Sequence, residues 1–472
     1  MKVKFLLLTI FFVLLSMLPN IVSAQTGAEV AQSIGKAGNG FSISSLLRGL
    51  LGMIVLIGIC FVFSTNRRAI SWRVVIFGLI FQLVLAIAVL KVPAIQHIIE
   101  FIARIFIKIL DSSNAGSSFL FKSFVTNKVE IGLINFAFQI LPTIIFFSAL
   151  TSVLFYYGII QKVVYGMAWL LTKVLRISGA EGLVASSNIF LGQTEAPFLI
   201  KEYLPKMNRS EIMLVMVAGM ATMAGGVLAI YIGLLGGDDP VGKMLFAKHL
   251  ITASVMAAPA AVVTSKILVP QTEKIESDIK ITKDRIGDNI LDAIANGTGS
   301  GLRLAVNVAA MLIAFIALIY FINFTLGKIG DWTHLNTMIA SLTGGVYEKF
   351  SLQFLLGYSL APLTWLMGVS ARDMTLVGQL LGEKIILNEM IGYASLKELV
   401  TAGAFYDQKS IILAVYVLCG FANFSSVGIQ IGGISAIAPN QRKTLSSLGF
   451  RALLGGGMTA LISATLVAMI LG

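Results

Sequence analysis

The sequence predicts an all-α protein that crosses a membrane about eight times and carries two re-entrant helical hairpins. Of its 472 residues, 57% are hydrophobic and only 12% are charged, whereas a soluble domain has about 25% charged residues. Only helices and closed barrels satisfy their own backbone inside a bilayer, and the apolar runs here are long and continuous rather than alternating. Two polar clusters, at 188–197 and 422–426, interrupt these runs and indicate a buried polar site.

The composition argues against several classes of function. The net charge of +12 comes from Lys and Arg in short loops between apolar runs, as expected for cytoplasmic loops, so no nucleic-acid partner is expected. Cys60 and Cys419 lie in apolar segments and give neither a disulfide framework nor a zinc pattern. The sequence lacks a Ser-His-Asp set, a metal-ligand cluster and a phosphate loop, so we expect no enzyme.

The first 24 residues have the pattern of a secretory signal peptide. Lys2 and Lys4 precede an apolar run over 5–18, and the small residues of 22–24 follow it. We expect cleavage after Ala24; an uncleaved first span is the alternative.

Three spans and one interfacial helix are expected next. The spans are predicted at 46–64, 74–91 and 133–158, the last with Pro142 near its middle. Residues 93–111 carry charges at helical spacing among Ile and Phe, which indicates an amphipathic helix in the membrane interface.

A re-entrant hairpin is predicted over 165–205. This stretch consists of two short apolar pieces broken at 192–197, and neither piece is long enough to span. Polar groups and free backbone at such a break are tolerated only inside protein or a cavity. A span at 211–235, with a weak point at 221–226, and a span at 245–268 are expected to follow.

The same order of parts recurs later in the chain. A charged cytoplasmic connector over 270–303 leads through an amphipathic helix to a sixth span at 304–325. A second hairpin is expected over 350–398, with a break at 368–370 and a tip near Asn388 and Glu389; spans at 410–434, interrupted by 423–426, and at 449–470 follow. Such a repeat predicts two inverted halves with substrate and ion bound at mid-membrane, and the loop charges place both termini outside.

The polar clusters suit a polar, planar ligand and a cation. Gln193, Thr194 and Glu195 offer an amide, a hydroxyl and a carboxylate in a row. Further groups that can hold vicinal hydroxyls or a flat ring are Glu389, Phe421, Asn423 and Ser426. Asn188 and Thr222 offer neutral oxygens beside helix breaks, where a hard cation such as sodium fits. Two alternatives stay open: such side chains can simply bond a neighbouring helix, and the pair Gly225-Gly226 can simply serve helix packing.

The motifs at 192–197, 388–389 and 420–426 resemble those of the concentrative nucleoside transporter family, and the resemblance runs from about residue 45 to the end. It implies that the nucleobase lies along Gln193, Thr194 and Glu195, with Val227 and Phe421 around it. It implies that Glu389, Asn423 and Ser426 hold the ribose. It assigns sodium to Asn188, Thr222 and the backbone near Leu191 and Met223; Thr222 stands where Ser is expected and keeps the oxygen.

The resemblance also implies a homotrimer in the inner membrane, with a fixed scaffold and a moving transport domain. The scaffold is expected over 25–160 and 269–330, and the two halves of the transport domain over 161–268 and 331–472. The expected function is sodium-driven nucleoside uptake by an elevator-like movement. Proton coupling through Glu195 or Glu389, a membrane-embedded enzyme acting on a nucleoside or lipid, and a channel are the alternatives. The sequence does not distinguish pyrimidine from purine nucleosides.

Overall fold

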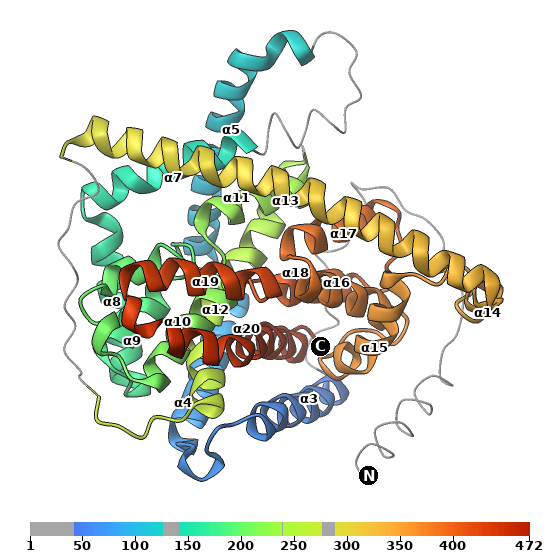
Figure 1. The fold of residues 1–472 in the computed structure, drawn as a ribbon, viewed down its shortest axis with the longest axis horizontal. Coiled ribbons are helices and arrows are strands. Elements are labelled where there is room, and N and C mark those ends of the chain that lie inside the picture. The colour runs from blue at the N-terminus through green and yellow to red at the C-terminus, as the bar shows by residue number, and fades with distance from the viewer. Residues whose placement is uncertain (1–41, 126–140, 238, 276–287) are drawn as a thin grey trace. The chain divides into compact units, whose positions relative to one another are not determined.

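The computed structural model describes residues 42–125, 141–237, 239–275 and 288–472, and every regular element in them is a helix (Figure 1). Five helices in these residues are long and apolar enough to cross a membrane, or six if one bent pair counts as a single span. The all-helical membrane fold is therefore confirmed. The predicted signal peptide lies outside the described residues.

The chain forms two compact units. The larger unit comprises the described residues of Leu56–Leu312 and Cys419–Ser463, and the smaller unit comprises those of Met1–Val55, Ile313–Leu418 and Ala464–Gly472. Most of the predicted site residues lie in the larger unit, and only Glu389 lies in the smaller one.

The first three described helices agree with the predicted positions. They are α3 (Ile43–Val62), α4 (Trp72–Lys91) and α5 (Pro93–Val125), with the short η1 (Arg67–Ala69) between the first two. Pro93 starts α5, where a missing N–H costs no intrahelical bond. The helix runs well past the predicted end at residue 111. Its Glu100 pairs with Lys248 at 2.5 Å, and the hydrogen bond from that ammonium lowers the pKa of the Glu100 carboxyl.

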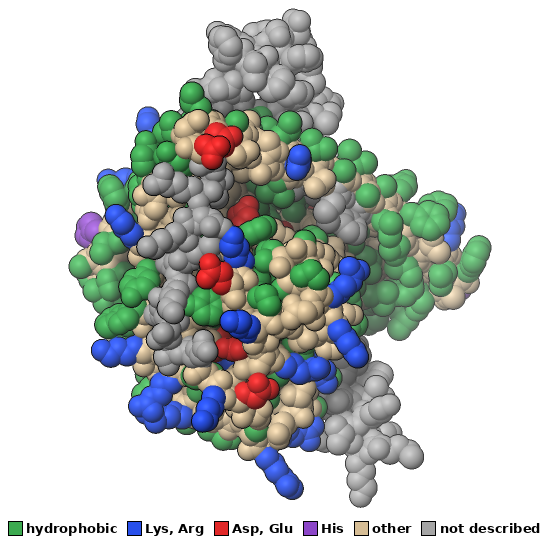
Figure 2. All heavy atoms as spheres, turned by 60° about the vertical axis from the view of Figure 1, so that its left-hand side comes forward, with side chains coloured by type: hydrophobic (Ala, Val, Ile, Leu, Met, Phe, Trp, Pro, Cys, Tyr) green, Lys and Arg blue, Asp and Glu red, His purple; other side chains and the backbone are tan. Residues whose placement is uncertain are grey.

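Helix α4 exposes a stripe of large apolar side chains, which suits contact with lipid. The stripe consists of Ile76, Phe77, Ile80, Val84 and Ile87. Apolar side chains also reach the surface over much of the face shown in Figure 2.

The structure corrects the start of the first hairpin. Helix α7 (Leu141–Tyr156) bends by 76° into α8 (Ile159–Leu175), with Gly158 in the left-handed region at the bend. Because α8 is a complete helix that ends at Leu175, the apolar piece from 165 belongs to it and not to the hairpin. The predicted mid-span place of Pro142 cannot be compared, since 126–140 lie outside the described residues.

The first hairpin begins at α9 (Gly179–Ser187), turns at 188–195 and returns through the 3-10 helices η3 (Ala196–Ile200) and η4 (Leu204–Lys206). Ser178 and Glu181 form a capping box that fixes the start of α9, because each side chain bonds the other's backbone N–H. The predicted break in the next span is confirmed, since α10 (Arg209–Ala221) and α11 (Gly225–Gly236) are separated by residues 222–224. Helix α12 (Pro240–Leu268) follows.

The second half of the chain needs two corrections. The amphipathic helix and the sixth span are one continuous 43-residue helix, α13 (Ile290–Trp332). The second hairpin consists of α16 (Met374–Ile386) and α17 (Glu389–Thr401), because the break at 368–370 separates it from an independent helix α15 (Leu352–Leu366). The short α14 (Leu335–Leu342) precedes α15.

The last predicted span pair is confirmed. The break at 419–423 divides α18 (Gln408–Leu418) from α19 (Phe424–Ile437), and α20 (Arg442–Leu471) closes the chain after η5 (Pro439–Gln441). The order hairpin, broken helix, long helix therefore occurs twice, as the sequence predicts.

Candidate functional site

The tip of the first hairpin is held in an irregular shape by short-range hydrogen bonds. The Leu191 amide donates to the Ser187 carbonyl at 2.8 Å, and the Glu195 amide donates to the Gly192 carbonyl at 3.0 Å. The Glu195 carboxylate accepts from the Gly192 amide at 3.1 Å. The carboxylate thereby closes the turn in which Gln193 and Thr194 lie.

The hairpin tip is tied to the break between α10 and α11. The Gly225 amide donates to the Phe190 carbonyl at 3.0 Å. A Cβ at Gly225 would lie 2.7 Å from the Phe147 ring of α7, so a glycine is needed for this close approach. Gly225 therefore serves helix packing, which is one of the two roles that the sequence leaves open for the pair Gly225-Gly226.

The four residues predicted to bind sodium lie at these two facing breaks, and all are buried. Asn188 caps the end of α9 and donates through Nδ2 to the Val184 carbonyl at 2.9 Å, while its buried Oδ1 has no partner among the described residues. Thr222 follows the last residue of α10 and donates to the Ala218 carbonyl at 2.9 Å, which leaves the hydroxyl lone pairs available. Leu191 and Met223 supply the neighbouring backbone.

The chemistry of this donor set fits a monovalent cation. The described residues contain no group of three or more His, Cys, Asp or Glu side chains that could hold a multivalent metal. The available ligands are neutral oxygens at the C-terminal ends of α9 and α10. Helix C-termini carry partial negative charge, which stabilises a cation within about one turn.

The backbone at a second break, directly before α19, packs closely against the end of α10. Gly420 has a φ of 87°, and a Cβ there would lie 2.5 Å from the Ala221 carbonyl oxygen, so the left-handed backbone and the close approach both require glycine. Asn423 then caps α19, because its Oδ1 accepts from the Ser426 amide at 2.9 Å. The packing places the start of α19 beside the hairpin tip.

Two of the predicted substrate residues meet across these elements. The Gln193 Nε2 donates to the Ser426 Oγ at 3.2 Å, and the buried Gln193 Oε1 has no partner within the described part of the chain. Thr194 also lies against α19, since a Cβ at Gly433 of that helix would lie 2.9 Å from the Thr194 methyl group. Phe421 is half-buried just before the Asn423 cap.

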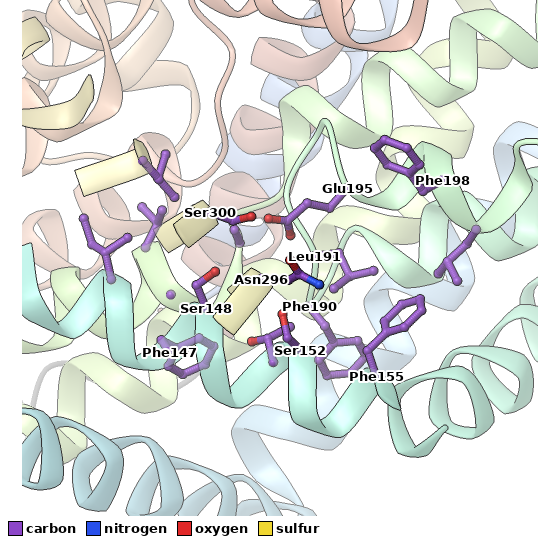
Figure 3. Close-up of a pocket in the computed structure, with 18 of the residues that line it drawn as sticks. Phe147, Ser148, Ser152, Phe155, Phe190, Leu191, Glu195, Phe198, Asn296 and Ser300 are labelled. Atoms are coloured by element: carbon purple, nitrogen blue, oxygen red, sulfur yellow. The ribbon is translucent and has the colours of Figure 1, made fainter. Parts of the chain in front are cut away.

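A cavity of about 460 Å³ opens beside the tip, within the size range of small-molecule sites (Figure 3). Of the predicted residues, Leu191, Glu195 and Val227 line it, whereas Gln193, Thr194, Phe421, Asn423 and Ser426 do not. Glu195 therefore lines the cavity, whereas Gln193 and Thr194 lie against α19.

The cavity also has a wall that the sequence analysis missed. Its polar members are Ser148, Thr151 and Ser152 from α7 with Asn296 and Ser300 from α13. Ser148 and Ser152 are four residues apart, as are Asn296 and Ser300, a spacing that places both members of each pair on one helix face, and this signal was present in the sequence. Their shared role depends on which faces of α7 and α13 meet, which only the fold decides.

Glu389 belongs to the smaller unit. It is the first residue of α17 and is buried, directly after Asn388, whose side chain caps the helix by accepting from the Ile391 amide at 3.0 Å. Its part in binding the ribose stays a prediction.

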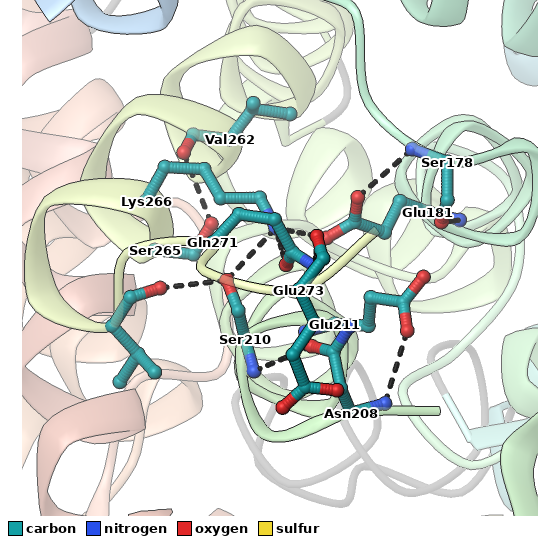
Figure 4. Close-up of polar contacts among 11 residues, drawn as sticks. Ser178, Glu181, Asn208, Ser210, Glu211, Val262, Ser265, Lys266, Gln271 and Glu273 are labelled. Carbon is teal, nitrogen blue, oxygen red and sulfur yellow. Dashed lines mark hydrogen bonds and ion pairs between the residues drawn. The ribbon is translucent and has the colours of Figure 1, made fainter. Parts of the chain in front are cut away.

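A buried ion pair fixes the base of the first hairpin (Figure 4). The Lys266 ammonium of α12 pairs with the Glu181 carboxylate of α9 and donates to the Ser210 hydroxyl of α10 at 2.9 Å. Its third described partner is the Gln271 side chain, at 3.2 Å. Because the two charges are almost fully buried, separating them would leave an uncompensated charge. The hairpin arm, α10 and α12 are thus joined into one body.

These features define a membrane transporter with a re-entrant hairpin, and comparisons with known proteins identify its family. Three family models match: the N-terminus of Na+ dependent nucleoside transporters at 51–124, nucleoside recognition at 137–238, and the C-terminus of Na+ dependent nucleoside transporters at 249–468. The chain belongs to the concentrative nucleoside transporter family.

Individual relatives agree with this assignment. An uncharacterized transporter of Haemophilus influenzae is 37% identical over 91% of this chain and 98% of its own length. Sodium/nucleoside cotransporter 1 of Rattus norvegicus is 37% identical over 88% of this chain, which spans only 62% of that relative. The structure of CNTnw in an inward-facing substrate-bound state matches with a TM-score of 0.80 and 35% identity, over 90% of this chain and 98% of that chain.

Proposed function

We propose that the protein imports nucleosides across the inner membrane by symport with sodium. The observation that carries this proposal is a pair of buried amide oxygens in one hairpin tip, Asn188 Oδ1 and Gln193 Oε1, that have no hydrogen-bond partner among the residues the structure describes. A buried amide oxygen without a partner costs free energy, so each oxygen favours a ligand that fills the gap. The first suits a cation and the second suits an N–H donor of a nucleobase.

Sodium would be held by Asn188 and Thr222 with the backbone near Leu191 and Met223. The described positions support this assignment because α9 packs on α10, and the turn after α9 is linked to the start of α11 by the bond between Phe190 and Gly225. Thr222 supplies the same kind of oxygen as the expected Ser.

The nucleoside would be bound by the residues around the tip. Gln193, Thr194 and Glu195 with Val227 and Phe421 would contact the base, and Glu389, Asn423 and Ser426 would hold the ribose. Glu195 and Val227 of this set line the cavity beside the hairpin tip. Sodium binding links to substrate binding because both ligands act on the same short loop, and such coupling is reciprocal.

Transport would follow an elevator-like movement in which the first hairpin moves together with α10–α12. The ion pair between Lys266 and Glu181 supports a rigid body of this kind. CNTnw has been solved in inward-facing and, as a variant, outward-facing states. We further propose a homotrimer whose scaffold is 25–160 and 269–330, whose transport domain is 161–268 and 331–472, and whose termini are external after removal of 1–24.

The decisive experiment measures uridine uptake into proteoliposomes, with an inward sodium gradient or with choline in its place. We expect uptake to require sodium. An uptake rate that does not depend on sodium but falls sharply at alkaline pH would establish proton coupling instead. The absence of uptake for every purine and pyrimidine nucleoside would overturn the proposal, and turnover of a nucleoside by the purified protein would point to an enzyme.

A further inference from the structure

The wall of the cavity opposite the hairpin tip consists of two helices whose backbones touch. A Cβ at Gly297 of α13 would lie 2.8 Å from the Ala149 Cα of α7, and a Cβ at Gly301 would lie 2.7 Å from the Ile145 Cα. Two glycines four residues apart allow such close contact between membrane helices. The wall formed by α7 and the start of α13 is therefore a fixed surface.

Polar side chains run along this wall toward the cavity. Ser148 and Ser152 on α7 and Asn296 and Ser300 on α13 all line it, and in Figure 3 they point into the same space as Glu195. None of the four side chains makes a hydrogen bond with another residue in the part of the chain that the structure describes. Their hydrogen-bonding capacity is therefore directed at whatever fills the cavity.

Aromatic rings flank the polar row. Phe147 and Phe155 of α7 lie on the wall side, and Phe190 and Phe198 lie on the hairpin side. Rings of this kind stack on nucleobases with little regard to base identity. Hydroxyls and an amide between aromatic faces match the chemistry of a nucleoside, which carries ribose hydroxyls on one part and a flat base on the other.

We propose that Ser148, Ser152, Asn296 and Ser300 form a second half of the nucleoside site, which binds the substrate on the side away from the hairpin. This inference rests on the proposed function. Residues four apart on a helix are separated by about 6 Å along its axis. The row therefore offers successive hydrogen bonds to a nucleoside that travels with the hairpin. A wholly apolar wall would instead impose a desolvation cost on the ribose.

The first test uses substrate protection of an introduced cysteine. Ser300→Cys places a thiol in the cavity, and Thr298→Cys places one on the same helix outside the cavity lining, where Thr298 is exposed and donates to the Ile294 carbonyl at 2.8 Å. The native Cys60 and Cys419 are buried. We expect saturating uridine to slow modification of Ser300→Cys by a charged methanethiosulfonate at least fivefold, while Thr298→Cys changes less than twofold.

Three outcomes would count against the proposal. Equal modification rates with and without uridine at Ser300→Cys, in protein that still transports uridine, would overturn the second half of the site and leave the proposed function intact. Equal protection at both positions would also overturn it, because a general movement of α13 would then explain the effect. Wild-type protein that transports no nucleoside would overturn the proposed function itself.

A kinetic test uses a different change. Asn296→Ala removes the amide without adding bulk, and Thr298→Ala is its control on the same helix. We expect the KM for uridine to rise at least threefold in the first variant and to stay unchanged in the second, at equal membrane abundance. An unchanged KM and maximal rate in Asn296→Ala would contradict the proposal.

Discussion

The Gln193 Nε2 donates a hydrogen bond to the Ser426 Oγ at 3.2 Å, although the two residues are 233 positions apart in the chain. This bond joins the tip of the first hairpin to the first turn of α19. In the proposed function Gln193 contacts the base and Ser426 the ribose, so the two halves of the substrate would be bound by side chains that also bond each other.

Loss of the Gln193 amide should weaken nucleoside binding. A hydrogen bond to a neutral partner contributes about 0.5–1.5 kcal/mol, and about 1.4 kcal/mol corresponds to a tenfold change in affinity. We expect Gln193→Ala to raise the uridine Kd about tenfold, as measured by titration calorimetry. Asn440→Ala, at an exposed residue that bonds the Pro205 carbonyl, is the control. Equal affinities for Gln193→Ala and the wild type would remove Gln193 from the site.

The hydroxyl of Thr222 should decide sodium affinity. Thr222→Ser keeps the oxygen and Thr222→Val removes it at nearly the same volume, so the pair isolates the ligand atom. We expect Thr222→Val and Asn188→Ala each to raise the sodium concentration for half-maximal uptake at least tenfold, and Thr222→Ser to change it less than threefold. Uptake of uridine against sodium concentration measures this, and similar curves for all four proteins would exclude the proposed ion site.

The contact between Gly225 and Phe147 should make position 225 intolerant of a side chain. A Cβ there would lie 2.7 Å from the Phe147 ring, whereas a Cβ at Gly226 would lie at 3.5 Å. Forcing a group into a packed site costs about 1–3 kcal/mol. We expect Gly225→Ala to lower the melting temperature of the purified protein, Gly226→Ala to change it little, and Phe147→Ala to restore part of the loss. A Gly225→Ala protein as stable as wild type would contradict this packing.

The buried ion pair should be more sensitive to the loss of one partner than of both. Removing one member of a buried pair costs about 3–5 kcal/mol, because the other charge is left uncompensated, while replacing both can be nearly neutral. We therefore expect Lys266→Met to be strongly destabilised and Lys266→Met combined with Glu181→Met to recover much of the stability. The melting temperature checks this; additive losses would show that the two charges do not stabilise each other.

Local signals predicted the broken helices well. Residues 221–226 contain the first break where the sequence places it. The second break, predicted at 423–426, lies slightly earlier, at 419–423, and Asn423 caps the helix that follows it. The predicted start of the first hairpin, at residue 165, was wrong, although Ser178 and Glu181 have the spacing of a capping box and mark the true start. The apolar run before these two residues belongs to α8, but hydropathy alone does not separate it from the hairpin or mark the sharp bend before it.

Tertiary packing explains the remaining differences. The sequence predicts an amphipathic helix separate from a sixth span at 304–325, whereas α13 is continuous there and its Gly297 and Gly301 bring it onto α7. The cavity wall escaped prediction for the same reason, since serines on an apolar helix do not reveal which neighbour they face. Gln193 and Ser426 were assigned to one site from their motifs, but their direct contact could be seen only in the fold.

The pairing of Lys266 with Glu181 has a consequence for the order of events during synthesis. The two residues are 85 positions apart, so the ribosome completes the first hairpin arm well before it makes the lysine that neutralises it. A carboxylate without a counter-ion is costly within a bilayer. We therefore expect the hairpin arm to stay near water until α12 has been inserted. In a chain that ends before residue 266, the Glu181 carboxylate would have no Lys266 partner, and the hairpin arm would be exposed to quality-control proteases.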